Sequence, residues 1–220
     1  MYVHPAFKVH RAVGLAFAAA RGFGHVIACE GSRPMAALLP FHVTEADGRL
    51  PRVQFHVARL NPLAQLAAKG GPWLIAVAGD DAYVSPHWYA SPEQVPTWLY
   101  EAVQLSGPVH VVPTDHTCDH LDRLVAQFES RLAPKPPWAA DGTLSPQRRA
   151  TLLKSIVVIE MTVETWRAAS NSINTRATPI MSPLSVRCAS GAGRPPRRLR
   201  RGWSRCGRTW RTNRQPTGRT

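Results

Sequence analysis

The sequence lacks any hydrophobic run long enough to cross a membrane. Its longest apolar stretch is AVGLAFAAA at residues 12–20, whereas a membrane-spanning helix needs about 20 predominantly apolar residues. An alanine-rich amphipathic helix accounts for this stretch better than a signal peptide does, although Lys8 and Arg11 precede it. The sequence therefore predicts a protein with no membrane partner.

Cysteine is scarce as well. The four cysteines, Cys29, Cys118, Cys188 and Cys206, form no CxxC pair. Their spacing therefore indicates no disulfide framework. A reducing cytoplasm is the simplest compartment for such a chain, and we expect a cytoplasmic protein.

The motifs of common catalytic centres are missing. The sequence contains no GxSxG elbow, no HExxH and no P-loop, and it shows no convincing nucleophile–base pair. GFGHVI (22–27) lacks the third glycine of a dinucleotide fingerprint. His116, Cys118 and His120 are close in sequence, but on a helix Cys118 points away from the two histidines. We therefore predict no metal site.

Acidic residues are absent from the end of the chain. Residues 167–220 contain 13 arginines and no Asp, Glu, Lys, His, Phe or Tyr, so they carry the whole formal net charge of +13. They also lack hydrophobic periodicity, and such a composition predicts disorder. We therefore divide the chain into a folded domain, 1–166, and a disordered arginine-rich tail, 167–220. Arginines in this number are suited to non-specific phosphate contacts, which makes nucleic acid a candidate partner of the tail.

The folded part alternates between strand and helix patterns. The hydrophobic spacing predicts helices at 12–20, 61–71, 114–132 and 146–154, and strands at 22–30, 34–43, 52–58, 72–79, 97–112 and 155–165. The predicted strand 97–112 is expected to bend or bulge around Ser106-Gly107-Pro108. Six or so mostly antiparallel strands with helices at their margins predict an α+β protein, mainly antiparallel β, that forms a barrel.

The stretch FHVARLNP (55–62) has the features of an anion site. Arg59 ends a predicted strand, and Asn61 and Pro62 occupy the N-cap and first position of the helix that follows. A helix N-terminus offers free N–H groups, and a guanidinium can hold phosphate oxygens in pairs. Alternatively, Arg59 is a solvated strand end and Asn61 is only a cap.

Residues 82–100 are rich in aromatic rings and in proline. Tyr83, Trp88, Tyr89, Trp98 and Tyr100 lie around a segment that reads as a proline-stiffened loop. Such rings hold flat heteroaromatic ligands, with about 1–3 kcal/mol for each stacked base. Together with the anion site upstream, they indicate a phosphorylated flat cofactor. Alternatively, the rings fill a barrel and a subunit interface.

Four segments resemble the PaiB-like family of FMN-binding, negative transcriptional regulators: MYVHPAFKV (1–9), HVARLNP (56–62), AYVSPHWY (82–89) and VPTWLYEAV (95–103). The resemblance runs in order to about residue 166. It implies a split β-barrel akin to that of pyridoxamine 5'-phosphate oxidase, with FMN bound between the subunits of a homodimer. It assigns cofactor binding to His56, Arg59, Asn61, Pro62, Tyr83, Ser85, Trp88, Tyr89, Thr97, Trp98 and Tyr100.

The sequence departs from the family pattern at several polar positions. Ala37-Leu38-Leu39-Pro40 stands where Ser/Thr-His-Leu-Pro is usual, Leu99 stands in place of an asparagine, and Gln104 or Leu105 falls where a histidine is usual. A lost hydrogen bond costs roughly 1 kcal/mol, so these changes predict weaker cofactor binding.

The family's usual ending is also missing after Trp166. The arginine-rich, acid-free tail has the composition that a shifted frame of a GC-rich gene tends to produce. We hypothesise that residues from about 167 onward are out-of-frame translation. A resequenced locus with no lost or gained base would refute this.

The sequence leaves three functions open. The first is an FMN-binding split-barrel protein with a regulatory role, which rests on the resemblance because residues 1–166 contain no clear DNA-reading element. The second is a flavin-dependent oxidoreductase, in which the flavin supplies the chemistry and no catalytic dyad is needed. The third is a cofactor-less member whose basic tail binds nucleic acid.

Overall fold

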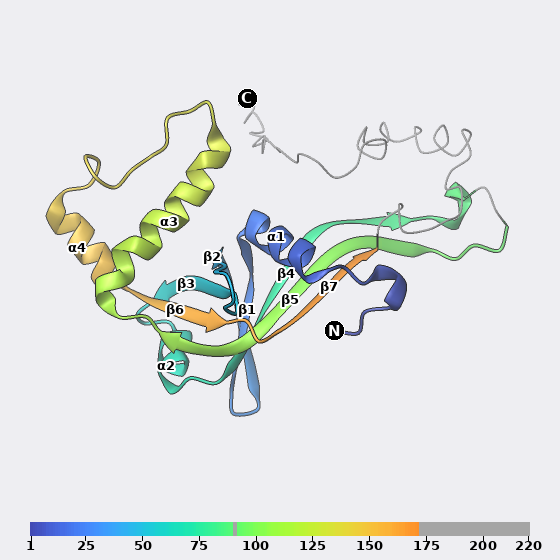
Figure 1. Cartoon of the computed structure of the whole chain (residues 1–220), viewed down its shortest axis with the longest axis horizontal. Coiled ribbons are helices and arrows are strands. Elements are labelled where there is room, and N and C mark those ends of the chain that lie inside the picture. Colours follow the sequence, from blue (N-terminus) through green and yellow to red (C-terminus); the bar gives the residue numbers. More distant parts are fainter. Residues whose placement is uncertain (90–91, 172–220) are drawn as a thin grey trace, which may run out of the picture. The chain divides into compact units, whose positions relative to one another are not determined.

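The computed structural model describes residues 1–89 and 92–171 (Figure 1). Its helices are α1 (Arg11–Arg21), α2 (Pro62–Lys69), α3 (Thr117–Glu129) and α4 (Pro146–Lys154). Its strands are β1 (Phe23–Glu30), β2 (Arg33–Thr44), β3 (Arg52–Ala58), β4 (Pro72–Val84), β5 (Thr97–Val111), β6 (Ile156–Thr162) and β7 (Thr165–Asn171). The strands and these helices belong to one compact unit, whereas Ser85–Val95 belongs to a second unit and is described separately.

The strands form one antiparallel sheet in the order β4-β1-β2-β3-β6-β5-β7. A further pairing of β4 with β5 closes six of the strands into a barrel. β5 pairs with β4 along one edge, and with β6 and then β7 along the other (Figure 1). The predicted α+β class with an antiparallel barrel is therefore confirmed.

Alternation along the strands determines what faces the barrel interior. In β3, Val53, Phe55 and Val57 are buried, while the residues between them are only partly buried or exposed. Phe55 stacks on Trp73 of β4 with 6.1 Å between ring centroids. Burying a side chain of this size contributes about 1.5–3 kcal/mol. The core thus stabilises the barrel and leaves the other face of β3 free for polar side chains.

The helices begin and end at residues that favour helix termini. Asn61 caps α2 by accepting a hydrogen bond from the Leu63 N–H at 3.0 Å, and Pro62 occupies the first turn. Gly22 ends α1 in the left-handed conformation, with φ 58°. Among the described residues, we find no helix with both the length and the hydropathy to span a bilayer.

Two strands differ from their predicted course. β4 runs to Val84, so Tyr83 lies on a strand and not in a loop. The register irregularity falls in β4 between Ala78 and Asp81, whereas β5 pairs without a break across Ser106–Pro108. The bulge expected at Ser106-Gly107-Pro108 is therefore absent there, and the extra residue lies in β4, opposite Tyr100 and Ala102.

The ordered chain also extends past the boundary predicted at residue 166. β7 pairs with β5 from Ser106↔Thr165 to Tyr100↔Asn171. Ala168 and Ala169 of β7 are buried, so residues 167–171 are not part of a disordered tail. The free edge of β5 decides this pairing, which depends on backbone groups and not on charge composition. The rest of the predicted tail, 172–220, lies outside the described residues.

Replacing Gly107 with alanine should destabilise the barrel by about 1–3 kcal/mol. A Cβ at this position would lie 1.8 Å from the carbonyl oxygen of Thr162, where β6 ends. Urea unfolding measures the loss. Gly48→Ala is the control, because its Cβ would meet nothing within 4 Å and only its backbone, with φ +71°, is strained, at about 1–2 kcal/mol. A Gly107→Ala variant no less stable than the wild type would contradict the crowding explanation.

Candidate functional site

A large pocket lies where β3 ends and α2 begins. It has a volume of about 690 Å³, and we call it the β3–α2 pocket. Its lining brings together three residues that the sequence nominated, His56, Arg59 and Asn61, while Pro62 follows directly at the start of α2. The full lining is Leu39, Pro40, His56, Val57, Ala58, Arg59, Leu60, Asn61, Ser155 and Ile156.

The Arg59 guanidinium supports the pocket wall. Its Nε donates to the Lys154 carbonyl at 2.8 Å, and its Nη2 donates to the Ile156 carbonyl at 3.0 Å. These bonds tie the end of β3 to the start of β6. Nη1 makes no hydrogen bond or ion pair within the described part of the chain, so it is available to a ligand.

The β3–α2 pocket has the size and polarity of a site for a phosphorylated ligand. Ligand pockets usually measure about 300–1,000 Å³ and combine an apolar lining with a few polar groups. Here Leu39, Pro40 and Ile156 supply apolar surface, and Leu60 is 97 % exposed at the rim. Nη1 of the Arg59 guanidinium supplies a donor for a phosphate, and the positive end of the α2 dipole attracts an anion. The Leu63 and Ala64 N–H groups at the start of α2 are already bonded to Asn61. The donor set therefore suits a phosphate at one end of the pocket.

The aromatic half of the predicted site lies elsewhere on the chain. Tyr83 of β4 and Trp98 of β5 are direct cross-strand partners, with ring centroids 6.0 Å apart and planes at 65°. They are 48 % and 56 % exposed, so they do not fill the core. Thr97 and Tyr100 are half-buried on the same strand. We call this part of the barrel the Tyr83–Trp98 end.

Within the barrel of one chain, the β3–α2 pocket and the Tyr83–Trp98 end do not meet. The Val112 N–H bonds to Val158, which is the cross-strand partner of His56. Trp98 lies about 14 residues earlier on the same strand, which corresponds to roughly 45 Å of strand at 3.3 Å per residue. Figure 1 shows the β4–β5 end well away from α2. A ligand of FMN size cannot contact both the β3–α2 pocket and the Tyr83–Trp98 end of the same barrel.

Ser85, Trp88 and Tyr89 belong to the separate unit Ser85–Val95. Ser85 caps a short 3-10 helix, Pro86–Trp88, by accepting from the His87 N–H at 3.4 Å. The side chains of Trp88 and Tyr89 are half-buried. Their assignment to cofactor binding stays a prediction.

The positions where the sequence departs from the PaiB-like pattern lie outside the β3–α2 pocket. Leu39 and Pro40, which match the pattern, line it, whereas Ala37 and Leu38 do not. Leu99 and Leu105 are buried in β5. The expected weakening of cofactor binding stays a prediction, and the lining of this pocket gives no reason for it.

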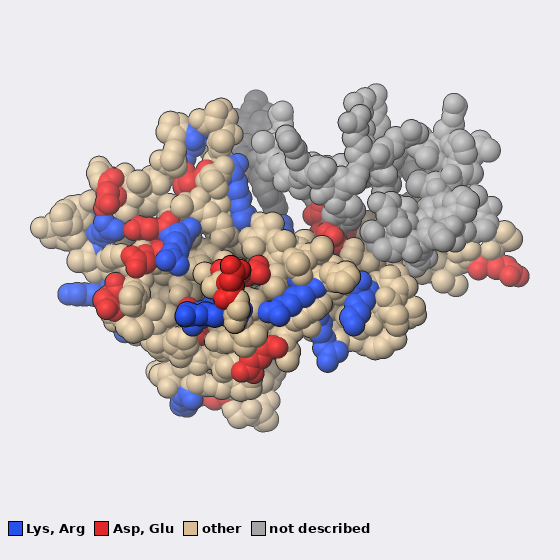
Figure 2. Space-filling view, in the orientation of Figure 1, with Lys and Arg blue, Asp and Glu red and all other residues tan. Residues whose placement is uncertain are grey.

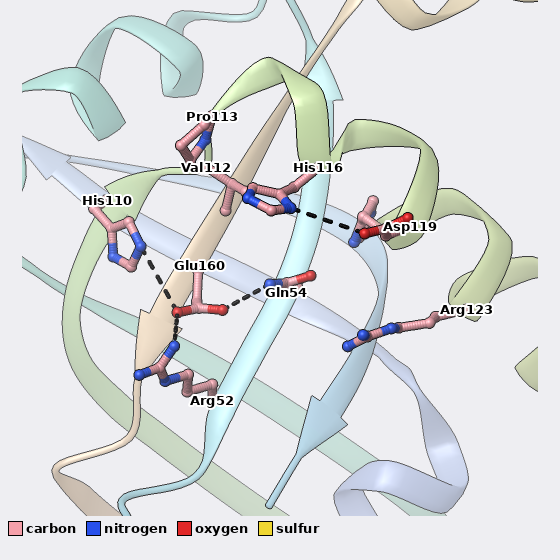
Figure 3. A pocket seen from close by; sticks show the side chains of 10 residues that line it. Arg52, Gln54, His110, Val112, Pro113, His116, Asp119, Arg123 and Glu160 are labelled. Atoms are coloured by element: carbon pink, nitrogen blue, oxygen red, sulfur yellow. Dashed lines mark hydrogen bonds and ion pairs between the residues drawn. The ribbon is translucent and has the colours of Figure 1, made fainter.

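A polar layer beneath α3 was not foreseen from the sequence (Figure 3). A second pocket of about 270 Å³ lies there, which we call the Glu160 pocket. Glu160 is 5 % exposed. Its Oε1 accepts from Arg52 Nη1 at 3.1 Å and lies 3.7 Å from His110 Nε2, and its Oε2 accepts from Gln54 Nε2 at 2.6 Å. The carboxylate is therefore satisfied on both oxygens although it is buried.

Replacing Glu160 with alanine should cost about 1–2 kcal/mol of unfolding free energy. The change leaves Gln54 without its acceptor and Arg52 without its counter-ion, and unmet polar groups cost about 1–3 kcal/mol. The loss stays at the lower end because Arg52 is half exposed and water can solvate it. Glu160→Gln is the control that keeps the shape. Chemical denaturation that finds no loss for alanine would contradict a stabilising role for the Glu160 pair.

His120 of α3, His42 of β2 and His56 of β3 form a hydrogen-bonded chain between the helix and the sheet, which we call the histidine chain. His56 Nδ1 and His120 Nε2 share a hydrogen bond of 3.0 Å, and His120 Nδ1 and His42 Nε2 share one of 3.2 Å. His120 is 1 % exposed and His42 is 5 % exposed. His56 lines the β3–α2 pocket, and His120 lines the Glu160 pocket. The chain thus runs between the two pockets.

The surroundings hold these rings neutral. Burial, followed by the neighbouring His56 and His42 and then Arg123, lowers the pKa of His120 from 6.5 to about 3. Burial also lowers the pKa of His56. The pKa of His42 is lowered by burial and Arg123, against the opposing effects of Gln54 and Glu160. At neutral pH each ring therefore carries one N–H.

His116 and His120, which share a predicted helix face, have different partners. His116 lies 3.8 Å from Asp119 and 4.0 Å from Asp115, while His120 joins the histidine chain. Over residues 1–89 and 92–171 there is no group of three or more His, Cys, Asp or Glu side chains that could hold a metal ion.

The alternation of buried and exposed residues along β3 was enough to predict that His56 lies on the polar face of this strand. Only the packing of α3 on the sheet brings His120 to it.

The barrel, with β6 and β7 in succession along one edge of β5, and the cofactor-sized pocket at β3–α2 define a split-barrel protein of the flavin-binding class. The chain belongs to the family described as "Putative FMN-binding domain", which matches residues 1–165. The PaiB-like resemblance is thereby confirmed. The chain is 31% identical over 170 residues to the protease synthase and sporulation protein PAI 2 of Bacillus subtilis (strain 168), covering 77% of this chain and 80% of that protein.

Solved structures share the fold at low sequence identity. The FAD and heme binding protein from Mycobacterium smegmatis matches with a TM-score of 0.53 and 16% identity, over 85% of this chain and 92% of that chain. The conserved hypothetical protein Rv2991 from Mycobacterium tuberculosis matches with a TM-score of 0.54 and 11% identity, over 83% and 96%. At these identities the likeness shows the split-barrel fold alone.

Proposed function

We propose that this protein is a homodimer that binds FMN between its subunits. The phosphate lies in the β3–α2 pocket of one subunit, and the flat ring system lies against the Tyr83–Trp98 end of the other. One observation supports the proposal: the β3–α2 pocket and the exposed rings of Tyr83 and Trp98 lie far apart within the barrel of a single chain. In a twofold symmetric dimer, the β3–α2 pocket of each subunit faces the Tyr83–Trp98 end of the other, so the complete site forms twice.

The residues of the pocket have distinct tasks in this arrangement. Arg59 Nη1 donates to the phosphate while Nε and Nη2 hold the wall in place. The start of α2 adds the positive end of the helix dipole. Leu39 and Leu60 exclude water from the cofactor, and His56 presents its second ring nitrogen, Nε2, to the pocket. Bound FMN supplies electron-transfer chemistry.

The regulatory role associated with the PaiB-like family is proposed to act through flavin binding. On the face in Figure 2, basic and acidic side chains of the described residues are interspersed. That face therefore offers no basic stripe of the kind that tracks a phosphate backbone. The predicted nucleic-acid contact through the arginine-rich tail concerns residues outside the described part.

Flavin-dependent oxidoreduction is the second candidate function. The observation that favours it is the histidine chain, which places a titratable ring on the cofactor pocket. Turnover of reduced nicotinamide by the FMN-loaded protein separates the two candidates. Steady oxidation of the nicotinamide supports an oxidoreductase, and its absence supports a binding or regulatory role.

Titration of FMN with the full chain, followed by the quenching of flavin fluorescence, tests the proposed binding. Saturation in the micromolar range or tighter is expected, together with sedimentation as a dimer. Lack of saturation would overturn the proposal.

Replacing Arg59 with alanine should weaken FMN binding about 10-fold or more, because a hydrogen bond to a charged group contributes about 1.5–3 kcal/mol. Arg49→Ala, which removes an exposed arginine outside the pocket lining, is the control. Equal affinities for the two variants would show that Arg59 does not contact the phosphate. Circular dichroism checks that the loss of the bonds to Lys154 and Ile156 has not unfolded the variant.

A further inference from the structure

We propose that the Glu160 pocket is a second ligand site, which binds a small oxyanion, that is, a carboxylate or phosphate compound smaller than FMN. This inference goes beyond the proposed function and does not depend on it, because the Glu160 pocket and the β3–α2 pocket share no lining residue. Two observations support it. The contact between α3 and the sheet is polar, and an arginine in that contact has no counter-ion among the described residues.

Four polar side chains form a row across the sheet, which we call the polar row. His42 of β2 is the cross-strand partner of Gln54 of β3, and Gln54 is the partner of Glu160 of β6. Glu160 in turn is the partner of His110 of β5. Directly paired residues of antiparallel strands point to the same face of a sheet. The whole row therefore lies on the face on which α3 packs.

The side of α3 above the polar row is polar as well. His116, Asp119, His120 and Arg123 have the i, i+3, i+4, i+7 spacing of one helix face, and all four line the Glu160 pocket. A helix that packs on a sheet normally places apolar side chains at this spacing. Burying polar groups costs free energy unless they are bonded, and proteins break such packing rules mainly at functional sites. The polar contact therefore indicates a site.

Arg123 has no counter-ion in the described part of the chain. Neither an ion pair nor a hydrogen bond joins its guanidinium to any residue of 1–89 or 92–171. Figure 3 shows the guanidinium reaching from α3 toward the sheet. Burial, and after it the charge of Arg123, lower the pKa of His42, so the guanidinium lies close to the polar row. Its paired N–H donors match the oxygens of a carboxylate or a phosphate.

The acidic groups of the pocket already have partners. Glu160 accepts a hydrogen bond on each of its oxygens, and Asp119 Oδ2 lies 3.8 Å from His116 Nδ1. Arg52 bonds only through Nη1 within the described residues, so its other nitrogens add donors, as does His110 beside Glu160. The pocket therefore has an excess of donors, and the oxygens of an anion supply the missing acceptors.

The size and lining of the pocket suit a ligand smaller than FMN. Its volume of about 270 Å³ lies below the roughly 300–1,000 Å³ that is usual for drug-sized ligands. Among the described residues that line it, only Val112 and Pro113 are apolar, so no Trp, Tyr or Phe ring is present there to hold a flat ligand. A phosphate or a small carboxylate fits this volume.

A structural role alone makes a different prediction. If the polar groups only hold α3 on the sheet, the pocket contains water, and dissolved anions affect Arg123 no more than any exposed arginine. A binding site instead requires that the response of Arg123 saturates with the anion concentration. Signals from single arginine side chains distinguish the two cases.

The test is proton–nitrogen NMR of the full chain labelled with nitrogen-15 arginine, without FMN, at pH 7 and constant ionic strength. Inorganic phosphate is added in one titration and malonate in another, with chloride as the reference anion. The Arg123 Nε–H signal is assigned by its loss in Arg123→Gln. We expect it to shift and saturate with phosphate or malonate, while the signal of the exposed Arg148 of α4 shifts weakly and without saturation.

Calorimetric titration supplies a second readout. Arg123→Gln should bind the anion about 10-fold more weakly or worse, because charge-assisted hydrogen bonds are roughly twice as strong as neutral ones. Arg123 is exposed, so this variant is expected to fold. Arg148→Gln is the matched control, because it removes the same charge from an exposed helix position outside the pocket lining. The arginine-rich tail is the same in both variants, so any anion that it attracts contributes equally.

The outcomes separate this inference from the proposed FMN binding. Saturation at Arg123 by phosphate alone assigns the site to phosphate compounds, saturation by malonate alone assigns it to carboxylates, and either result supports the inference, as does saturation by both. Absence of saturation with both probes, or equal affinities for Arg123→Gln and Arg148→Gln, would overturn it and leave FMN binding untouched. Displacement of the probe from Arg123 by FMN would also overturn it, because the two sites would then not be separate.

Discussion

Acidification from pH 7 to pH 5 should lower the free energy of unfolding by about 2 kcal/mol through His120 alone. The pKa of His120 is about 3 in the folded protein, against an ordinary value of 6.5. Between these two values the unfolded chain binds a proton that the folded protein does not, so stability falls as the pH falls. The slope is about 1.4 kcal/mol per pH unit for one proton, and pH 5 lies 1.5 units below 6.5.

The same sign applies to the rest of the histidine chain. The pKa values of His42 and His56 are also lowered by burial, so their contributions are present above about pH 6.5 and are lost on acidification. The three losses add in one direction, and the total therefore exceeds the loss from His120 alone. Above pH 7 the three rings are neutral in both states, and we expect no further change from them.

Urea unfolding at pH 7, 6 and 5 measures this effect. His120→Phe is the matched variant, because it keeps a ring in the buried site and removes the titrating nitrogen. The carboxylates titrate alike in both proteins, so the difference between the two pH profiles isolates His120. Parallel profiles for the wild type and the variant would show that His120 is not held neutral in the fold.

Replacing Trp98 with alanine should weaken FMN binding by about 10- to 100-fold while leaving the fold intact. A stacked ring contributes about 1–3 kcal/mol to the binding of a flat ligand, and 1.4 kcal/mol is a factor of ten. The side chain is 56 % exposed and makes a ring contact with Tyr83. Its removal therefore creates no core cavity, and the unfolding free energy should change by no more than about 0.5 kcal/mol.

Trp138→Ala is the matched control for this prediction. Trp138 is 39 % exposed and lies between α3 and α4, away from both halves of the proposed site. Flavin fluorescence titration should give wild-type affinity for Trp138→Ala and weaker binding for Trp98→Ala. If both variants bind FMN like the wild type, the Tyr83–Trp98 end does not hold the cofactor, and the proposed dimer arrangement fails.

Local patterns in the sequence predicted the elements that depend on neighbours in the chain. The cap at Asn61, the proline that begins α2 and the alternation in β3 are set by backbone donors and side-chain spacing within a few residues. The family motifs then identified the fold class and indicated a candidate anion site. Composition was a weaker guide, because it placed the end of the folded domain at 166 and missed the pairing of β7 with the free edge of β5.

The sequence by itself therefore determined an antiparallel barrel, its helix caps and a candidate phosphate site at Arg59 and Asn61. Only the tertiary structure decided that Tyr83 and Trp98 lie far from that site within the barrel, and that His120 of α3 meets His42 and His56 of the sheet. The reason is physical. Caps and alternation arise from contacts over a few residues, whereas the histidine chain joins rings that are 64 and 78 positions apart in the sequence. Such contacts depend on how the strands pair and how α3 packs, which no local pattern specifies.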